Sequence, residues 1–123
     1  MGSDEALFDS IGTIAKEKTF VGQNSMSFLK FMSHTVAANI AAMFKIRGRN
    51  IPACSACTSS SMAIGIGYES IKYGMSDMMF VGGSEEAHPY NAGIFEIMAA
   101  TSTRYNDTPD QTPRPFDTER DGL

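Results

Sequence analysis

Two short apolar segments on either side of a helical pattern constrain the fold of this chain more than any other feature. The residues NIPACSAC at 50–57 and DMMFVGG at 77–83 are apolar and bounded by turn residues, as buried strands are. Between them, residues 59–73 can be capped by serines, carry apolar side chains at helical spacing and stop at Gly74. A strand–helix–strand unit of roughly 30 residues has parallel strands. The pattern therefore predicts an α/β fold.

Further helices are predicted on both sides of this unit. Residues 4–18 have weak helical patterning that Gly12 interrupts, whereas residues 25–44 repeat apolar side chains at helical spacing and predict one long helix. Residues 90–101 are predicted as another helix. From Ser102 onward Asn, Asp, Thr and Pro dominate, so the tail is predicted as a long loop.

The composition excludes several functional classes. The 123 residues include 10 Lys and Arg against 14 Asp and Glu, a net charge of -4, so the basic excess that binds nucleic acids or anionic membranes is absent. No apolar run approaches the roughly 20 residues of a membrane span, and the acidic N-terminus is unlike a signal peptide. Two cysteines are too few for a secreted disulfide framework. We expect one soluble, cytoplasmic domain with no nucleic-acid or membrane partner.

Cys57 is the strongest candidate for a chemical role. The pattern places it at the carboxyl end of a predicted strand and at the amino end of the following helix. Free amides and the positive dipole end of a helix stabilise a thiolate, and the same amides can donate to an oxyanion on a thioester carbonyl. The alternative is a buried inert thiol, which is a common state of unpaired cysteine.

Cys54 and Cys57 also form a CxxC pair, which leaves two further interpretations open. The first is a thiol-disulfide redox module that uses both cysteines, although Cys54 falls inside the predicted strand. The second is half of a zinc site, which would need two more ligands. His34 and His88 lack metal-ligand spacing and are interpreted as a helix residue and a surface residue. We therefore expect no metal site.

Four motifs, in order along nearly the whole chain, carry a resemblance to a known family. They resemble the β-ketoacyl-acyl carrier protein synthases, the condensing enzymes with the thiolase fold. The motifs are SACTSSSMAIG at 55–65, GMSDMMFVGGSEE at 74–86, STRYNDTP at 102–109 and RPFDTERDG at 114–122. The tail STRYNDTP is similar to the elongating synthases of fatty acid synthesis. The resemblance implies an α/β, thiolase-like fold with a mostly parallel sheet and flanking helices.

The resemblance also implies a reaction and roles for individual residues. In the family, an active-site cysteine takes an acyl group from the phosphopantetheine of acyl carrier protein, and a malonyl-carrier protein then loses carbon dioxide and condenses with it. Cys57 lies at the nucleophile position, and its backbone amide would be one oxyanion donor. Phe95 falls where the family lines the acyl pocket, and Lys16 and Lys18 lie near where some members bind the carrier protein. No bound cofactor is implied, and the full-length parent is expected to be a homodimer.

Some parts of the family pattern have no match in this sequence. Two histidines and a lysine that serve decarboxylation come from a later part of the family's longer chain, and His34 and His88 lie in segments that do not correspond. The resemblance thus implies that residues 1–123 are a single partial domain from the middle of the N-terminal half of the condensing-enzyme fold, inactive alone. A further alternative is a non-catalytic chain-length or interaction subunit of a polyketide-type synthase.

Overall fold

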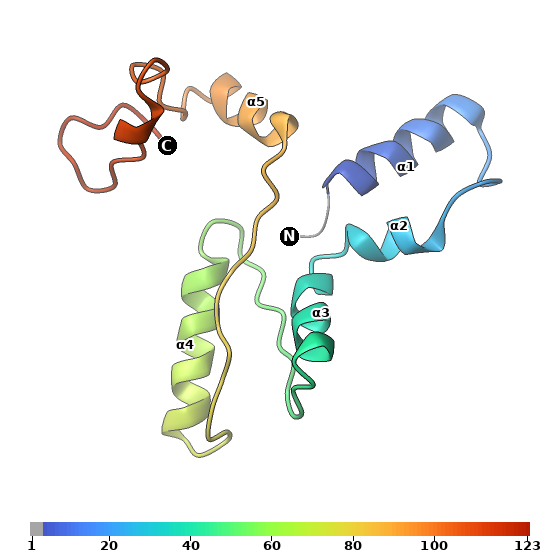
Figure 1. The fold of residues 1–123 in the computed structure, drawn as a ribbon, viewed down its shortest axis with the longest axis vertical. Helices are drawn as coiled ribbons and strands as arrows, with labels where there is room; N and C mark the ends of the chain where they lie inside the picture. Colours follow the sequence, from blue (N-terminus) through green and yellow to red (C-terminus); the bar gives the residue numbers. More distant parts are fainter. Residues whose placement is uncertain (1–3) are drawn as a thin grey trace. The chain divides into compact units, whose positions relative to one another are not determined.

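The structure is a computed structural model that describes residues 4–123 and divides into two compact units, one ending at Glu86 and the other comprising Ala87–Leu123. The first contains α1 (Asp4–Glu17), α2 (Ser25–Lys30), α3 (Thr35–Met43) and α4 (Ser59–Lys72), and the second contains α5 (Pro89–Ile97) and the short 3-10 helix η1 (Pro109–Gln111) (Figure 1).

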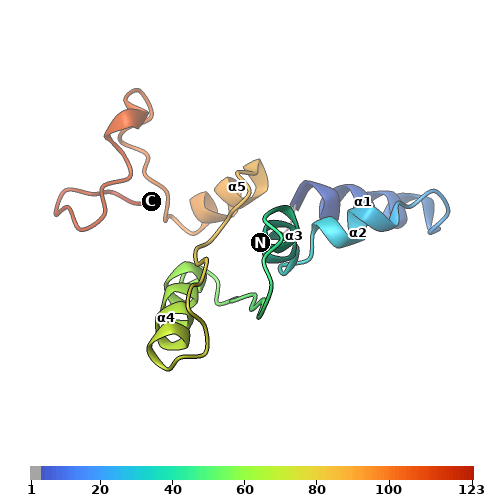
Figure 2. The same ribbon diagram turned by 60° about the horizontal axis from the view of Figure 1, so that its bottom comes forward.

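The helix predicted at residues 4–18 is confirmed as α1, which packs beside α2 (Figures 1 and 2). The single long helix predicted for residues 25–44 is wrong, because the chain breaks it into α2 and α3. The Thr35 hydroxyl donates to the Leu29 carbonyl, an oxygen that an uninterrupted helix would give to the amide four residues later. The amide of Met32 also donates a hydrogen bond to the Leu29 carbonyl, at 3.4 Å, where the helix is interrupted.

The helix predicted before Gly74 is confirmed as α4, and its end has a defined cap. Gly74 takes φ +67, its amide donates to the Ile71 carbonyl at 3.0 Å, and the Met75 amide donates to the Ser70 carbonyl at 2.8 Å. This pair of bonds is a Schellman motif, in which a glycine adopts the left-handed conformation that other residues disfavour. The cap turns the chain back along α4.

The returning segment 77–83 lies directly against α4 (Figures 1 and 2). A β-carbon placed on Gly67 of α4 would come within 2.4 Å of Val81 Cγ1, and one placed on Gly83 would come within 1.9 Å of Ser60 Oγ. Gly67 therefore allows an approach that a side chain would block, whereas at Gly83 the Ser60 hydroxyl would have to move. Gly67 and Ser70 are the buried positions of α4.

The predicted strands at 50–57 and 77–83 do not form as strands anywhere in residues 4–123. The described chain has one isolated bridge, between Ser55 and Cys57. A strand exists only where a neighbour completes its hydrogen-bond ladder, and neither segment has such a neighbour here. Both segments run against the direction of α4, which is the arrangement of a strand–helix–strand unit (Figure 1).

The second unit consists of α5, η1 and the tail. Its helix α5 begins where His88 Nδ1 accepts from the Tyr90 amide at 3.2 Å. The predicted helix 90–101 ends early, at Ile97, because Ala99 takes the left-handed conformation, φ +54, and closes another Schellman motif. The long loop predicted after Ser102 is confirmed except for η1.

Apolar side chains remain accessible throughout the described part of the chain, and none of them is buried. The rings of Phe44 and Phe80 stack with their centroids 6.0 Å apart, yet Phe80 is still 67% exposed. Local hydrogen bonds and close glycine contacts, rather than an apolar core, thus define the geometry around α4. Among the helices of residues 4–123, none has the length and hydrophobicity needed to cross a bilayer.

Candidate functional site

Cys57 lies in a tight turn that leads into α4, at the amino end of the helix as predicted, although the predicted strand before it does not form. Ala56 directly before it has φ +45, a left-handed conformation that costs free energy for any residue with a β-carbon. The thiol of Cys57 is unbonded and the residue is exposed. Cys57 is thus not buried in this structure, and its chemical role stays a prediction.

A closed set of hydrogen bonds holds this turn. Ser59 Oγ accepts from the Ser55 amide at 2.8 Å and donates to the Ala56 carbonyl at 2.7 Å. Thr58 Oγ1 donates to the Ser55 carbonyl at 2.8 Å and lies 3.0 Å from Ser55 Oγ. The amides of Thr58 and Ser59 donate to the carbonyls of Ser55 and Ala56 at 3.0 and 3.1 Å. Three hydroxyl side chains thus surround the cysteine and fix the backbone around it.

The amide of Cys57 is available to a ligand. Within residues 4–123 it donates no hydrogen bond to the protein, and the same is true of the amides of Ser60 and Ser61 in the first turn of α4. Free first-turn amides and the positive end of the helix dipole favour negative charge. An exposed thiol can attack a carbonyl, and free amides beside it can donate hydrogen bonds to the oxyanion that forms.

Cys54 is the other free thiol of the described residues. It is exposed and it forms no disulfide with Cys57. No group of three or more His, Cys, Asp or Glu side chains suited to a metal ion occurs in the part of the chain described here. His34 stands just before α3, and His88 caps α5 with its ring nitrogen. The structure thus assigns His88 a local structural contact.

The remaining predicted site residues lie on other elements. Lys16 is in the last turn of α1, where its Nζ is 3.8 Å from Glu17 Oε1 and its side chain is 83% exposed. Lys18 follows the helix with φ +54. Phe95 is half-buried on α5 in the second unit, whereas Cys57 belongs to the first. The structure brings the two lysines to the same end of α1.

Asp121 organises the tail, a role that sequence reasoning missed. Its carboxylate accepts from Ser102 Oγ at 2.7 Å and from the amides of Thr103 and Arg104 at 2.9 and 2.8 Å. These bonds lower the pKa of Asp121 to about 2, and the bond from the Ser102 hydroxyl has the largest effect. The RDG motif is thereby tied to the STRYNDTP motif.

Arg114 makes a second link between the tail motifs. It contacts Asp117 Oδ2 through Nε and Nη2 at 3.1 and 2.9 Å, and its Nη1 donates to the Tyr105 hydroxyl at 2.6 Å. The Glu119 amide and then the Arg114 guanidinium lower the pKa of Asp117. The sequence RPFD places Arg114 three residues before Asp117, a spacing from which their ion pair could have been predicted. Nothing in the sequence indicated the contact with Tyr105.

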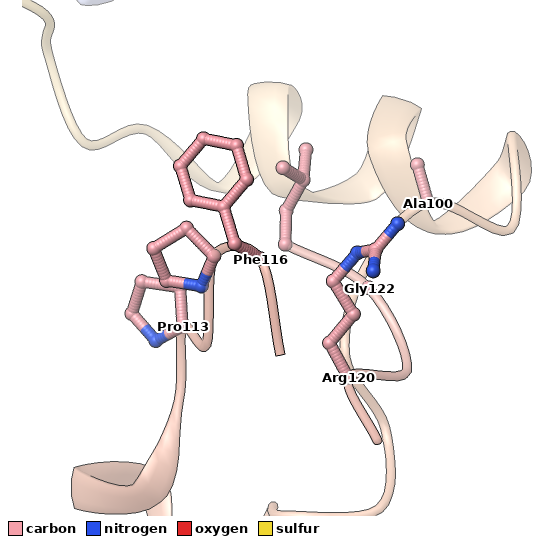
Figure 3. A pocket seen from close by; sticks show the side chains of 7 residues that line it. Ala100, Pro113, Phe116, Arg120 and Gly122 are labelled. Carbon is pink, nitrogen blue, oxygen red and sulfur yellow. The ribbon is translucent and has the colours of Figure 1, made fainter. Parts of the chain in front are cut away.

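The same unit contains a hollow of about 470 Å³, and Figure 3 shows the Phe116 ring and the Arg120 guanidinium on different sides of it. Phe116 is 99% exposed, and Arg120 Nη1 donates to the Asp117 carbonyl at 3.0 Å. The lining of the hollow is mostly apolar and consists of Ala100, Pro113, Pro115, Phe116, Arg120, Gly122 and Leu123. No predicted site residue lines it.

Comparison with known proteins agrees with the motifs around Cys57 and in the tail. The sequence profile described as "Beta-ketoacyl synthase, N-terminal domain" matches residues 2–123. The 3-oxoacyl-acyl-carrier-protein synthase 1 of Haemophilus influenzae is 43% identical over 94 residues, which are 76% of this chain and 23% of that protein. The enzyme of the same name from Buchnera aphidicola subsp. Baizongia pistaciae is 36% identical over 122 residues, covering 99% of this chain and 30% of that protein.

A solved structure gives the same result for the backbone. The crystal structure of a β-ketoacyl synthase from Burkholderia phymatum superposes with a TM-score of 0.82 at 42% identity, covering 99% of this chain and 29% of that one. The chain thus spans about a quarter to a third of the length of the relatives it matches. Because the profile of the family's N-terminal domain matches almost every residue, the chain belongs to the β-ketoacyl synthase family.

Proposed function

We propose that Cys57 is the acyl-accepting nucleophile of a β-ketoacyl-acyl carrier protein synthase of fatty acid biosynthesis. One observation carries the proposal: an exposed, unbonded thiol lies on a hydrogen-bonded turn at the start of α4, in a chain of this family. The named relatives are 3-oxoacyl-acyl-carrier-protein synthases, which supports the reaction class and the carrier-bound substrate.

The first half of the reaction is an acyl transfer between two sulfur atoms. The Cys57 thiol gives up its proton to solvent, and Sγ attacks the thioester carbonyl of an acyl group held on phosphopantetheine. The carbon–sulfur bond to phosphopantetheine then breaks, and its thiolate leaves and takes a proton. The products are an acyl group on Cys57 and a free carrier thiol. The unpaired amide of Cys57 supports oxyanion stabilisation during the attack.

The second half is a decarboxylative condensation. The bond between the malonyl α-carbon and its carboxylate breaks, carbon dioxide leaves, and the electron pair stays on the α-carbon. That carbanion attacks the Cys57 thioester, forms the new carbon–carbon bond and releases the cysteine thiolate. The histidines and lysine that the resemblance implies for this half have no matching position in residues 1–123. The proposal therefore assigns acyl acceptance to this chain, and carbon dioxide release only to the longer protein.

The proposal includes partners and further residues. Acyl carrier protein is an acidic partner in this resemblance, and two exposed cations at one end of α1, Lys16 and Lys18, offer the complementary charge. Phe95 is proposed to line the acyl pocket, which its apolar ring suits. The longer protein is proposed to be a cytoplasmic homodimer. In it, segments 50–57 and 77–83 would be strands of the mostly parallel sheet of a thiolase-like fold.

The proposal is tested in the full chain, that is, in the longer protein. The protein is incubated with a carrier protein that is loaded with an acyl group, and its intact mass is measured. We expect a mass gain of one acyl group that maps to Cys57, is retained in Cys54→Ala and is absent in Cys57→Ala. Redox chemistry at a CxxC pair predicts instead that both substitutions abolish turnover of a disulfide substrate. A non-catalytic subunit predicts no acyl adduct at all. Either of these results, or an adduct at Cys54, would show that the proposed function is wrong.

A further inference from the structure

We propose that Ser59 is a positioning residue for the acyl-transfer step, because its hydroxyl sets the orientation of the Cys57 amide. The inference rests on the proposed function and deepens it. Ser59 is the first residue of α4, and its side chain contacts the Ser55 amide and the Ala56 carbonyl rather than the thiol.

Ser59 holds the peptide group that joins Ala56 to Cys57. Its carbonyl accepts from Ser59 Oγ at 2.7 Å and from the Ser59 amide at 3.1 Å. A trans peptide group is planar, so its N–H points opposite to its carbonyl. By holding the Ala56 carbonyl, Ser59 therefore also fixes the direction of the Cys57 N–H, which is the proposed oxyanion donor.

Ala56 is held in a left-handed conformation. Ala56 has φ +45 and carries a β-carbon, so a return to a negative φ would lower its free energy. Such a change would rotate the same peptide group. The Ser55 amide donates to Ser59 Oγ at 2.8 Å and has no other acceptor within residues 4–123, so the Ser59 hydroxyl closes the turn from both ends. The clamp thus opposes the relaxation.

Ser59 differs from the neighbouring hydroxyl residues in its contacts. Thr58 Oγ1 contacts only the carbonyl and hydroxyl of Ser55, so it does not touch the peptide group that joins Ala56 to Cys57. Ser61 lies in the same helical turn, is exposed and makes no hydrogen bond to another described residue through its side chain. Ser59 alone bridges the amide of Ser55 and the carbonyl of Ala56, and Ser61 is its matched control.

Two reactions of the same thiol distinguish positioning from general structure. Attack on an acyl-thioester creates an oxyanion and uses the Cys57 amide, whereas alkylation by iodoacetamide displaces iodide at a saturated carbon and creates none. In a Cys54→Ala background of the full chain, Ser59→Ala is expected to slow acylation by roughly 10- to 100-fold, somewhat less than loss of an oxyanion donor. The rate of alkylation is expected to stay within about twofold, as thiol access is unchanged.

An isosteric pair keeps the test decisive if Ser59→Ala folds poorly. Ser59→Thr keeps the hydroxyl, and Ser59→Val has nearly the same shape without it. We expect Ser59→Thr and the control Ser61→Ala to be acylated at close to the parent rate. Ser59→Val is expected to be acylated slowly and alkylated at the parent rate. Equal acylation by the Thr and Val variants, or a parallel fall in acylation and alkylation, would overturn the inference. Failure of the parent itself to acylate at Cys57 would instead overturn the proposed function.

Discussion

The carboxylate of Asp121 accepts a hydrogen bond of 2.7 Å from the hydroxyl of Ser102, 19 residues earlier in the chain. The amides of Thr103 and Arg104 donate to the other oxygen of the same carboxylate. Beside this contact, the Ser102 amide donates to the Leu123 carbonyl at 2.9 Å, and the Leu123 amide donates to the Ala100 carbonyl at 2.8 Å. Two of the tail motifs are thus one structural unit, in which a single ionised side chain satisfies three donors.

The first prediction is a pH dependence of the tail. The folded pKa of Asp121 is lowered from 3.8 to about 2, so its contribution to stability is present above about pH 4 and is lost as the pH falls through 2. We expect the amide signals of Thr103 and Arg104 to shift together over that window in an NMR titration of the full chain. Asp121→Asn removes the ionisable group and is the control: its amides are expected not to follow this transition. A midpoint near 4 in the parent would contradict the assignment.

The second prediction concerns two glycines of α4 in opposite environments. Gly67 faces Val81 at a distance that a β-carbon cannot share, so Gly67→Ala is expected to destabilise the packing of segment 77–83 by about 1–3 kcal/mol. Gly65 has no atom within 4 Å of its β-position, so Gly65→Ala is expected to stabilise the helix by up to about 1 kcal/mol. Urea unfolding of the full-chain variants measures both. Effects of the same sign would refute the close contact.

The third prediction uses the caps of α4 and α5. Both helices end in a Schellman motif, with Gly74 at φ +67 in one and Ala99 at φ +54 in the other. Because a β-carbon disfavours this conformation by about 1–2 kcal/mol, Gly74→Ala is expected to lower the melting temperature and Ala99→Gly to raise it. Calorimetry of the full-chain variants gives the two signs. A cap geometry that differs from this one would make Ala99→Gly destabilising.

The fourth prediction concerns the thiols. Cys54 and Cys57 are both free and exposed, so a chromogenic disulfide reagent is expected to react with two thiols per chain without denaturant. Cys54→Ala and Cys57→Ala are each expected to leave one. Two thiols that appear only after addition of a reductant would show a Cys54–Cys57 disulfide and would favour the redox interpretation.

The helices show how far local patterns predict this fold. The bounds of α1 and α4 follow largely from apolar spacing and, at the end of α4, from Gly74, which act within a few residues. The predicted serine cap of α4 is wrong, because its N-cap is Thr58, which makes no side-chain cap hydrogen bond. The break between α2 and α3 was not predictable from the same spacing, because the bond from Thr35 to Leu29 competes with the helix ladder. The segments 50–57 and 77–83 have the composition of strands, but composition supplies no pairing partner.

The site divides in the same way. The sequence by itself determined the family, through four motifs, and the nucleophile candidate, through a cysteine at the start of a helix. Only the tertiary structure decided that Ala56 is left-handed, that Ser59 clamps the peptide before Cys57, and that Asp121 reaches back to Ser102. The reason is physical: capping and periodicity depend on neighbours along the chain, whereas a backbone conformation with positive φ or a contact over many residues depends on what else the fold brings near it.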